Sequence, residues 1–119
     1  MLLLKRLLLP LACIGAVAAS PAPATTAIAD ILAKPASFDN QHLSVSGTIE
    51  KLAEKTSRRG NDYTTFDLCD GTCVHVYSHG HPKIADGQAV TVHGTFFADK
   101  HMGTLEFKNE LDADDGSLP

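Results

Sequence analysis

The segment from residue 63 to residue 79 constrains the fold most, because its apolar residues alternate on both sides of a short polar turn. The turn is Asp70-Gly71-Thr72, and the alternating apolar residues are Phe66, Leu68, Val74 and Val76. Side chains of a β-strand point alternately to opposite faces, so these four side chains share one face in a single register. That register predicts a hairpin with the following pairs: Cys69 with Cys73, Asp67 with His75, Thr65 with Tyr77, and Tyr63 with His79.

Three further segments show the same period of two and are expected to be strands. They are residues 42–49, 88–97 and 103–111, in addition to the hairpin strands at 63–69 and 73–78. Gly47 and Gly94 interrupt two of these segments, at positions where a strand would bend to close a barrel. Residues 51–61 show no clear alternation and end in a polar loop at residues 57–61. The pattern predicts an all-β fold, a five-stranded Greek-key barrel of the OB type.

One short helix is predicted before the first strand. Ile28, Ile31 and Leu32 have helical spacing, and Thr25 or Thr26 is placed to cap the N-terminus of the helix. Pro35 follows and is expected to end it.

The first 19 residues have the three parts of a secretory signal peptide. Lys5 and Arg6 supply positive charge, residues 7–17 form an apolar run, and residues 16–20 offer the small side chains at which signal peptidase cuts. The apolar run is well short of the roughly 20 residues that span a bilayer. We expect an exported protein, periplasmic or secreted, without a membrane span. The alternative is a lipoprotein anchored through Cys13.

The rest of the chain is predicted to hold one domain between two polar segments. Residues 20–26 are expected to form a flexible tether, residues 27–112 the OB-fold domain, and residues 113–119 an acidic tail that frays. Without Lys5 and Arg6, eight basic residues face fourteen acidic ones. This excess of acidic residues argues against non-specific binding to the phosphate backbone of nucleic acids. We expect a monomer.

Two cysteines remain once the predicted signal peptide is removed. An even number of cysteines in an oxidising compartment predicts a disulfide between Cys69 and Cys73, which are opposed in the hairpin. The simpler interpretation is a staple across the hairpin. A redox role is the alternative, but the pair lacks the helix N-terminus that lowers thiol pKa values in Cys-x-x-Cys enzymes.

Several motifs resemble those of bacterial exported OB-fold proteins of the tRNA anticodon-binding-like group. They are Val45-Ser46-Gly47-Thr48-Ile49, the run at 63–68 with Asp70-Gly71, the run at 86–94, and Phe107-Lys108-Asn109-Glu110-Leu111. The resemblance implies an OB barrel of the nucleic-acid-binding type. The haem chaperone of cytochrome c maturation is another exported OB barrel, which attaches haem through a His-x-x-x-Tyr stretch. No histidine follows His101 in this chain.

The outer face of the second and third strands is the candidate binding site, because this face binds ligands in many OB domains. We expect it to hold a protein, a peptide or a small ligand. Single-stranded nucleic acid is the alternative, with bases stacking on the two tyrosines and phosphates meeting the two arginines. The candidate residues are Arg58, Arg59, Tyr63, Thr65, Asp67, His75 and Tyr77.

Histidines offer a third hypothesis, a transition-metal site. His75, His79 and His81 are close in sequence, and imidazole suits zinc and copper. The main prediction is nevertheless that the protein has no cofactor. Asp67 with His75 could act as a general-base pair, but no nucleophile has a matching local spacing. We therefore predict that the protein is not an enzyme.

Overall fold

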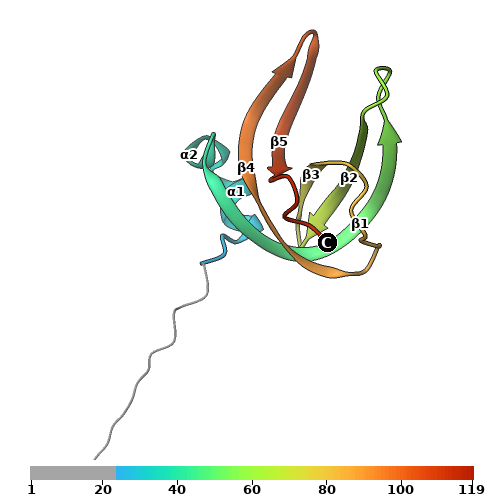
Figure 1. Cartoon of the computed structure of the whole chain (residues 1–119). Helices are drawn as coiled ribbons and strands as arrows, with labels where there is room; N and C mark the ends of the chain where they lie inside the picture. Colours follow the sequence, from blue (N-terminus) through green and yellow to red (C-terminus); the bar gives the residue numbers. More distant parts are fainter. Residues whose placement is uncertain (1–23) are drawn as a thin grey trace, which may run out of the picture.

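Five strands follow two short helical turns in the computed structural model, which describes residues 24–119 (Figure 1). The elements are α1 (Ile28–Ala33), α2 (Pro35–Phe38), β1 (His42–Thr56), β2 (Asp62–Cys69), β3 (Cys73–His79), β4 (Ala89–Met102) and β5 (Leu105–Ala113). The predicted signal peptide, Cys13 and residues 20–23 of the predicted tether lie outside the described residues.

The strands close into a barrel in the order β1-β2-β3-β5-β4, and β4 pairs with β1 to complete the ring. Neighbouring strands are antiparallel except β3 and β5, which are parallel. An all-β barrel of five strands is thus present, as the alternating segments predict. Among residues 24–119, no helix is long and apolar enough to cross a membrane.

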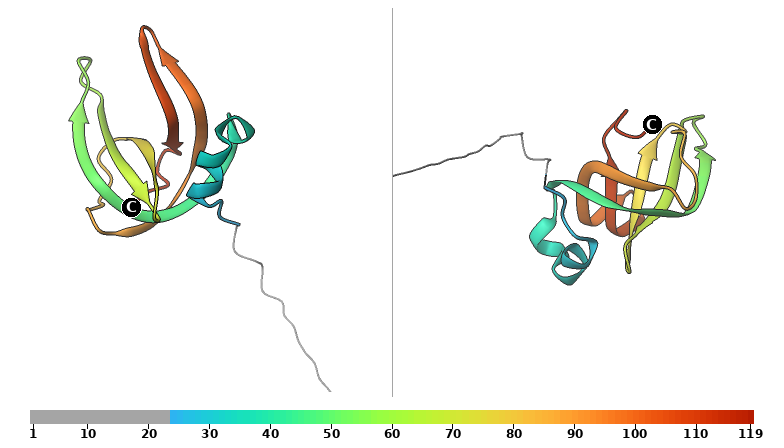
Figure 2. Two further views of the ribbon diagram at one scale, coloured as in Figure 1. Left: turned by 180° about the vertical axis from the view of Figure 1, so that it is seen from behind. Right: turned by 90° about the horizontal axis from the view of Figure 1, so that it is seen from below.

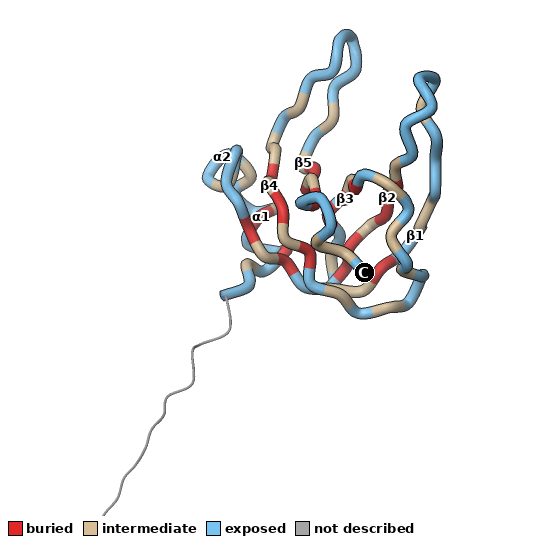
Figure 3. The backbone as a smooth tube through the Cα atoms, in the orientation of Figure 1, coloured by how far each residue is buried: buried red, intermediate tan, exposed pale blue. Residues whose placement is uncertain are grey.

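The barrel core is built from the alternating apolar positions of the strands, and the buried residues gather where the strands meet (Figure 3). Phe66 and Phe96 are the largest of its fully buried side chains. Ile28 and Ile31 of α1 are buried in the same cluster. The two helical turns lie together at one side of the barrel, where they cover this part of the core (Figure 2).

The helical segment differs from the predicted single helix. Ala27, not Thr25 or Thr26, occupies the N-cap position of α1, so no side chain caps this end. Pro35 follows α1 and is also the first residue of a second helical turn, α2. A proline is tolerated at the first helical position because its missing N–H would have no partner there.

Gly47 and Gly94 lie at close approaches between neighbouring strands. A Cβ atom at position 94 would lie 2.1 Å from the carbonyl oxygen of Asp112 on β5. At position 47 it would lie 2.8 Å from the carbonyl oxygen of Cys69 on β2. Both distances are too short for a carbon atom, so the barrel closes at these points because the side chains are absent.

Two hairpins extend beyond the barrel as arms, and this feature was not predicted (Figure 1). β1 continues through residues 51–56, where the sequence shows no clear alternation, and its register with β2 shifts between Glu50 and Ala53. Lys51, inside this bulge, has a φ of 54°. A bulge resets which face alternate residues occupy, which explains why the alternation is lost from the sequence.

We call residues 51–65 the β1–β2 arm and residues 98–109 the β4–β5 arm. β4 continues to Met102, beyond its predicted end at residue 97, whereas β5 begins at Leu105, two residues after its predicted start. Both arms are largely exposed towards their tips (Figure 3).

The acidic tail was predicted to fray, but it makes contacts with the barrel. Ala113 is the last residue of β5, and the next amide, that of Asp114, donates to the carbonyl of His93 (2.8 Å). The amide of Lys83 donates to the carbonyl of Pro119 (2.7 Å), and Leu118 packs against the core. These contacts hold the tail to β4 and to the loop between β3 and β4.

Candidate ligand-binding cleft

The β2–β3 hairpin has the register that the sequence predicts. The observed pairs are Tyr63 with His79, Thr65 with Tyr77, Asp67 with His75, and Cys69 with Cys73. The core residues Phe66, Leu68, Val74 and Val76 lie on the other face and are buried. The predicted outer face is therefore present on β2 and β3.

Three aromatic side chains are in contact on this outer face. The rings of Tyr63 and Tyr77 are stacked, with centroids 5.4 Å apart and planes inclined by 23°. The ring of His79 meets Tyr77 edge-on, with centroids 5.3 Å apart. Stacked and edge-on pairs are the favourable arrangements of such rings, so the three side chains support one another.

A cleft of about 1280 Å³ lies between this face and the two arms. Six of the seven candidate binding residues line it: Arg58, Arg59, Tyr63, Thr65, His75 and Tyr77. Asp67 lies outside the lining, where its carboxylate contacts His75 Nδ1 at 3.3 Å. The structure thus brings most of the predicted residues to one concave surface.

The opposite wall of the cleft comes from the β4–β5 arm and was not predicted. Its residues in the lining are Lys100, Met102, Leu105 and Phe107, with Glu110 just below the arm. The sequence signal was the apolar residues on either side of Gly103, which the barrel core does not use. In cross-strand register Met102 faces Leu105, and Lys100 faces Phe107.

Lys100 links the arm to the cleft floor through an ion-pair network. Its ammonium donates to Asp112 Oδ2 at 2.7 Å and to Glu110 Oε2 at 3.0 Å. The same nitrogen lies 5.1 Å from the centroid of the Tyr77 ring, within cation–π range. Burial lowers the pKa of Lys100, but the hydrogen bonds to Asp112 and Glu110 outweigh it, so the pKa is raised above 10.5.

Glu110 is a buried carboxyl group, with 3% of its surface exposed. Burial raises its pKa above the ordinary value of 4.5, and the neighbouring Asp112 raises it further, whereas Lys100 acts in the opposite direction. Among residues 24–119, Asp112 Oδ1 is buried without a hydrogen-bond partner. A protonated Glu110 would supply a hydrogen-bond donor to the neighbouring Asp112. The two adjacent carboxyl groups therefore favour retention of a proton on Glu110.

Tyr77 lies between the aromatic cluster and the ion-pair network. Burial raises the pKa of its phenol above 10.0, while Lys100 acts against this shift. The hydroxyl group therefore stays protonated at neutral pH and can both donate and accept a hydrogen bond in the cleft.

Comparison of the chain with models of protein families, with curated proteins and with solved structures found no match. The functional argument therefore rests on the geometry of the cleft.

The histidines of the metal hypothesis do not converge on one point. His75 contacts Asp67, His79 meets Tyr77, and His81 Nε2 lies 3.1 Å from the carbonyl oxygen of Lys55. In the described part of the chain, two groups of three potential ligands have their ligand atoms within 4.8 Å of one another, and neither contains these histidines. The groups are Glu50, Cys69 and Cys73, and Asp99, His101 and Glu106.

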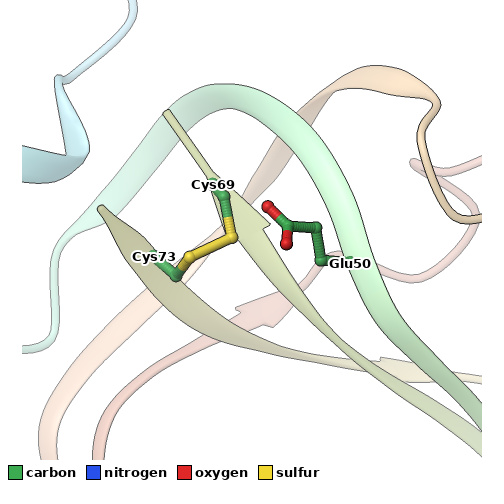
Figure 4. Close-up of side chains that lie close together, drawn as sticks. All are labelled: Glu50, Cys69 and Cys73. Carbon is green, nitrogen blue, oxygen red and sulfur yellow. A yellow bond between two sulfur atoms is a disulfide. The ribbon is translucent and has the colours of Figure 1, made fainter. Parts of the chain in front are cut away.

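Cys69 and Cys73 form the predicted disulfide, with Cα atoms 4.1 Å apart. The carboxylate of Glu50, on β1, points towards the bridge (Figure 4). Because the sulfur atoms are bonded to each other, they cannot act as thiolate ligands, and this group is not a metal site. Cys73 is exposed, whereas Cys69 is buried, so solvent reaches the bridge from the Cys73 side.

Proposed function

We propose that the protein is an exported binding module of the OB type, which holds a protein, peptide or small ligand in the cleft between its arms without chemical conversion. The strand order and the parallel β3–β5 pair support this assignment. OB domains bind ligands on the face of strands two and three, flanked by the connections between strands one and two and between strands four and five. The cleft occupies the equivalent position.

The proposal rests on one observation: the aromatic cluster and both arms line the same cleft. A typical ligand site is concave, mostly apolar and supplied with a few polar groups that fix orientation. Here Tyr63 and Tyr77 supply the apolar floor, and Thr65 supplies a hydroxyl group beside them. Arg59 adds positive charge from the β1–β2 arm, whereas the charge of Lys100 on the other side is paired with Glu110 and Asp112.

Site-specific photocrosslinking tests the proposal in the cell that produces the protein. A benzophenone amino acid replaces Asn61, an exposed residue of the cleft lining, or Thr91, an exposed residue of β4 that contacts Ser46 away from the cleft. We expect a discrete adduct, resolved by mass spectrometry, from position 61 alone. The absence of an adduct, or the same adduct from both positions, would contradict the proposal.

Single-stranded nucleic acid is a second candidate, favoured by the tyrosine pair and the arginines in one cleft. Stacked aromatic rings bind bases irrespective of sequence, and cationic side chains contact phosphates. A twelve-nucleotide oligo(dT) is the probe. Tight binding that weakens steeply as salt rises would support this candidate, because each neutralised phosphate releases counterions.

Export is proposed from the predicted signal peptide together with the Cys69–Cys73 disulfide, since disulfides persist in oxidising compartments. The intact mass of the protein purified from its native cells tests this point. A chain that begins near residue 20 supports cleavage and release. A mass that begins at a lipidated Cys13 would support the lipoprotein alternative.

A further inference from the structure

The edge of β5 that faces the cleft is unpaired over about half of the strand. β5 pairs with β4 from Leu105 to Lys108 and from Glu110 to Ala113, with a break at Asn109, whose φ is 54°. Its pairing with β3 is confined to Glu110–Asp112 within the described chain. The backbone of residues 105–109 therefore presents free N–H and C=O groups on one side, the feature that allows another strand to add to a sheet.

Apolar side chains stand beside this free edge. Leu105 is 60% exposed and its cross-strand partner Met102 is 56% exposed. Phe107 lines the same cleft and is half-buried. Glu106 and Lys108 occupy the alternate positions, where they pair with each other at 3.2 Å. The exposed apolar surface is therefore concentrated on the cleft side of the arm, where a partner would cover it.

The β1–β2 arm, on the other side of the cleft, is basic instead of apolar. Lys55, Arg58 and Arg59 line the cleft from the β1–β2 arm. Asp62, an acidic residue of this wall, accepts a hydrogen bond from Thr56 (2.8 Å), and Glu110 on the floor is paired with Lys100. An occupant of the cleft thus meets positive charge on one side and apolar side chains with a free backbone edge on the other.

We infer that the occupant of the cleft is an extended, acidic polypeptide segment that adds as a strand to residues 105–109 of β5. This inference rests on the proposed binding function and specifies its ligand. Alternate side chains of such a segment point to opposite faces. Its apolar side chains cover Met102, Leu105 and Phe107, and its carboxylates reach Arg58 and Arg59.

The free backbone edge favours a peptide over the other ligands. The cleft, at about 1280 Å³, exceeds the roughly 300–1,000 Å³ of small-molecule sites. A nucleic acid has no peptide backbone to complete the β5 ladder, and its phosphates gain nothing from the leucine and methionine of the arm.

Fluorescence anisotropy with defined peptides tests the inference. The probe is an eight-residue fluorescein-labelled peptide that alternates glutamate with leucine. The matched control alternates lysine with leucine. Two further versions of the acidic probe carry N-methyl groups on one or the other alternate set of backbone nitrogens, because N-methylation removes the hydrogen-bond donors from a single edge.

The acidic probe is expected to bind at least about tenfold more tightly than the lysine control. One N-methylated version should lose about tenfold or more, since each lost backbone hydrogen bond contributes about 1 kcal/mol, and the other version should bind like the parent. Equal binding of the acidic and lysine peptides, or no loss from either N-methylated version, would overturn the inference.

Substitutions locate the binding on the protein. Leu105→Ser and the double substitution R58A/R59A change exposed side chains and should each weaken the acidic probe about fivefold. The double substitution K34A/K83A removes the same charge from exposed residues outside the cleft lining and should leave binding unchanged. Unchanged binding by L105S would overturn strand addition at β5.

Oligo(dT) provides the remaining comparison. Displacement of the acidic peptide by the oligonucleotide at lower concentration than by unlabelled peptide would overturn the inference in favour of nucleic acid. Failure of every peptide, together with a discrete crosslink from position 61, would overturn the inference while the proposed binding function stands.

Discussion

The ammonium of Lys100 donates a 2.7 Å hydrogen bond to the carboxylate of Asp112, between the β4–β5 arm and the stretch of β5 that pairs with β3. Asp112 pairs in the sheet with Tyr77 of β3 and with Thr95 of β4. The salt bridge therefore connects the part of β5 that lies between β3 and β4 to the arm that forms one wall of the cleft. Stability of the fold and the position of this wall depend on the same contact.

Replacement of Lys100 by methionine should destabilise the protein. The change keeps most of the apolar stem but leaves Glu110 and Asp112 as adjacent carboxyl groups without a cation. We expect a loss of about 2 kcal/mol in the free energy of unfolding, measured by urea denaturation near pH 7. The control is K108M, because Lys108 is 69% exposed and pairs with Glu106 at the surface. Equal shifts for the two variants would contradict the network.

The raised pKa of Glu110 predicts a specific pH dependence. The folded protein retains the Glu110 proton at pH values where the unfolded chain, with a pKa near 4.5, has lost it. The contribution of this group to stability is therefore greatest below pH 4.5 and falls as pH rises through the folded-state pKa.

Comparison with Glu110→Gln isolates this contribution, because glutamine does not titrate. Urea midpoints between about pH 4 and pH 8 should fall with rising pH more steeply for the parent than for E110Q. The exposed Glu54 offers the control, and E54Q should follow the parent. A difference between the parent and E110Q that does not change with pH would contradict the assignment.

Gly94→Ala should destabilise the barrel by about 3 kcal/mol, because the new methyl group would collide with the backbone of Asp112. Thermal unfolding followed by circular dichroism gives the measurement. Gly87→Ala is the matched comparison. Its φ is 87°, and within residues 24–119 no atom beyond its two chain neighbours lies within 4 Å of the new Cβ, so its cost is the backbone strain alone, about 1 kcal/mol. Similar losses for both variants would mean that β4 and β5 can separate at Gly94 without cost.

Alternation predicted the β2–β3 hairpin from the sequence because both of its strands carry one buried face. Phe66 and Leu68 on one strand and Val74 and Val76 on the other leave a single register that buries all four. The disulfide and most of the cleft floor followed from that register. Local pattern was sufficient here because the core decides the position of every side chain in these two short strands.

The arms could not be predicted in this way, because their residues lie beyond the core. Past the bulge at Lys51 the alternation of β1 is reset. In the other arm, Lys100, Met102, Leu105 and Phe107 face a cleft instead of a packed interior. The spacing of apolar residues in the arms does not reflect burial in the barrel core, so it gives only a weak alternation. The tail was mispredicted for a related reason: its acidity suggested solvation, whereas Leu118 and two backbone hydrogen bonds hold it.

Glu50→Gln should accelerate reduction of the Cys69–Cys73 disulfide by glutathione. The attacking thiolate must approach sulfur atoms beside the Glu50 carboxylate (Figure 4). Repulsion between unit charges about 4 Å apart in water is about 1 kcal/mol before screening, so a rate increase of about two- to fourfold is expected. Thiol alkylation followed by mass spectrometry measures the rate, with E106Q as the distant control. Equal rates of reduction in E50Q and the parent protein would show that the Glu50 carboxylate does not slow attack on the disulfide.

Removal of residues 114–119 should weaken the fold, because the tail contributes contacts that an unstructured segment would not. The truncation deletes the amide of Asp114 that donates to His93, the carbonyl of Pro119 that accepts from Lys83, and the packing of Leu118. Two backbone hydrogen bonds and one partly buried leucine together predict a loss of about 2 kcal/mol in urea denaturation.

Leu118→Ser separates the two contributions of the tail. It removes the apolar contact and keeps the backbone hydrogen bonds, so it should cost about half as much as the truncation. Asp115→Asn changes an exposed residue of the same tail and serves as the control for altered charge. If the truncated protein unfolded at the same urea concentration as the full chain, the tail would be bound too weakly to count as part of the barrel. The domain would then end at Ala113, where β5 ends.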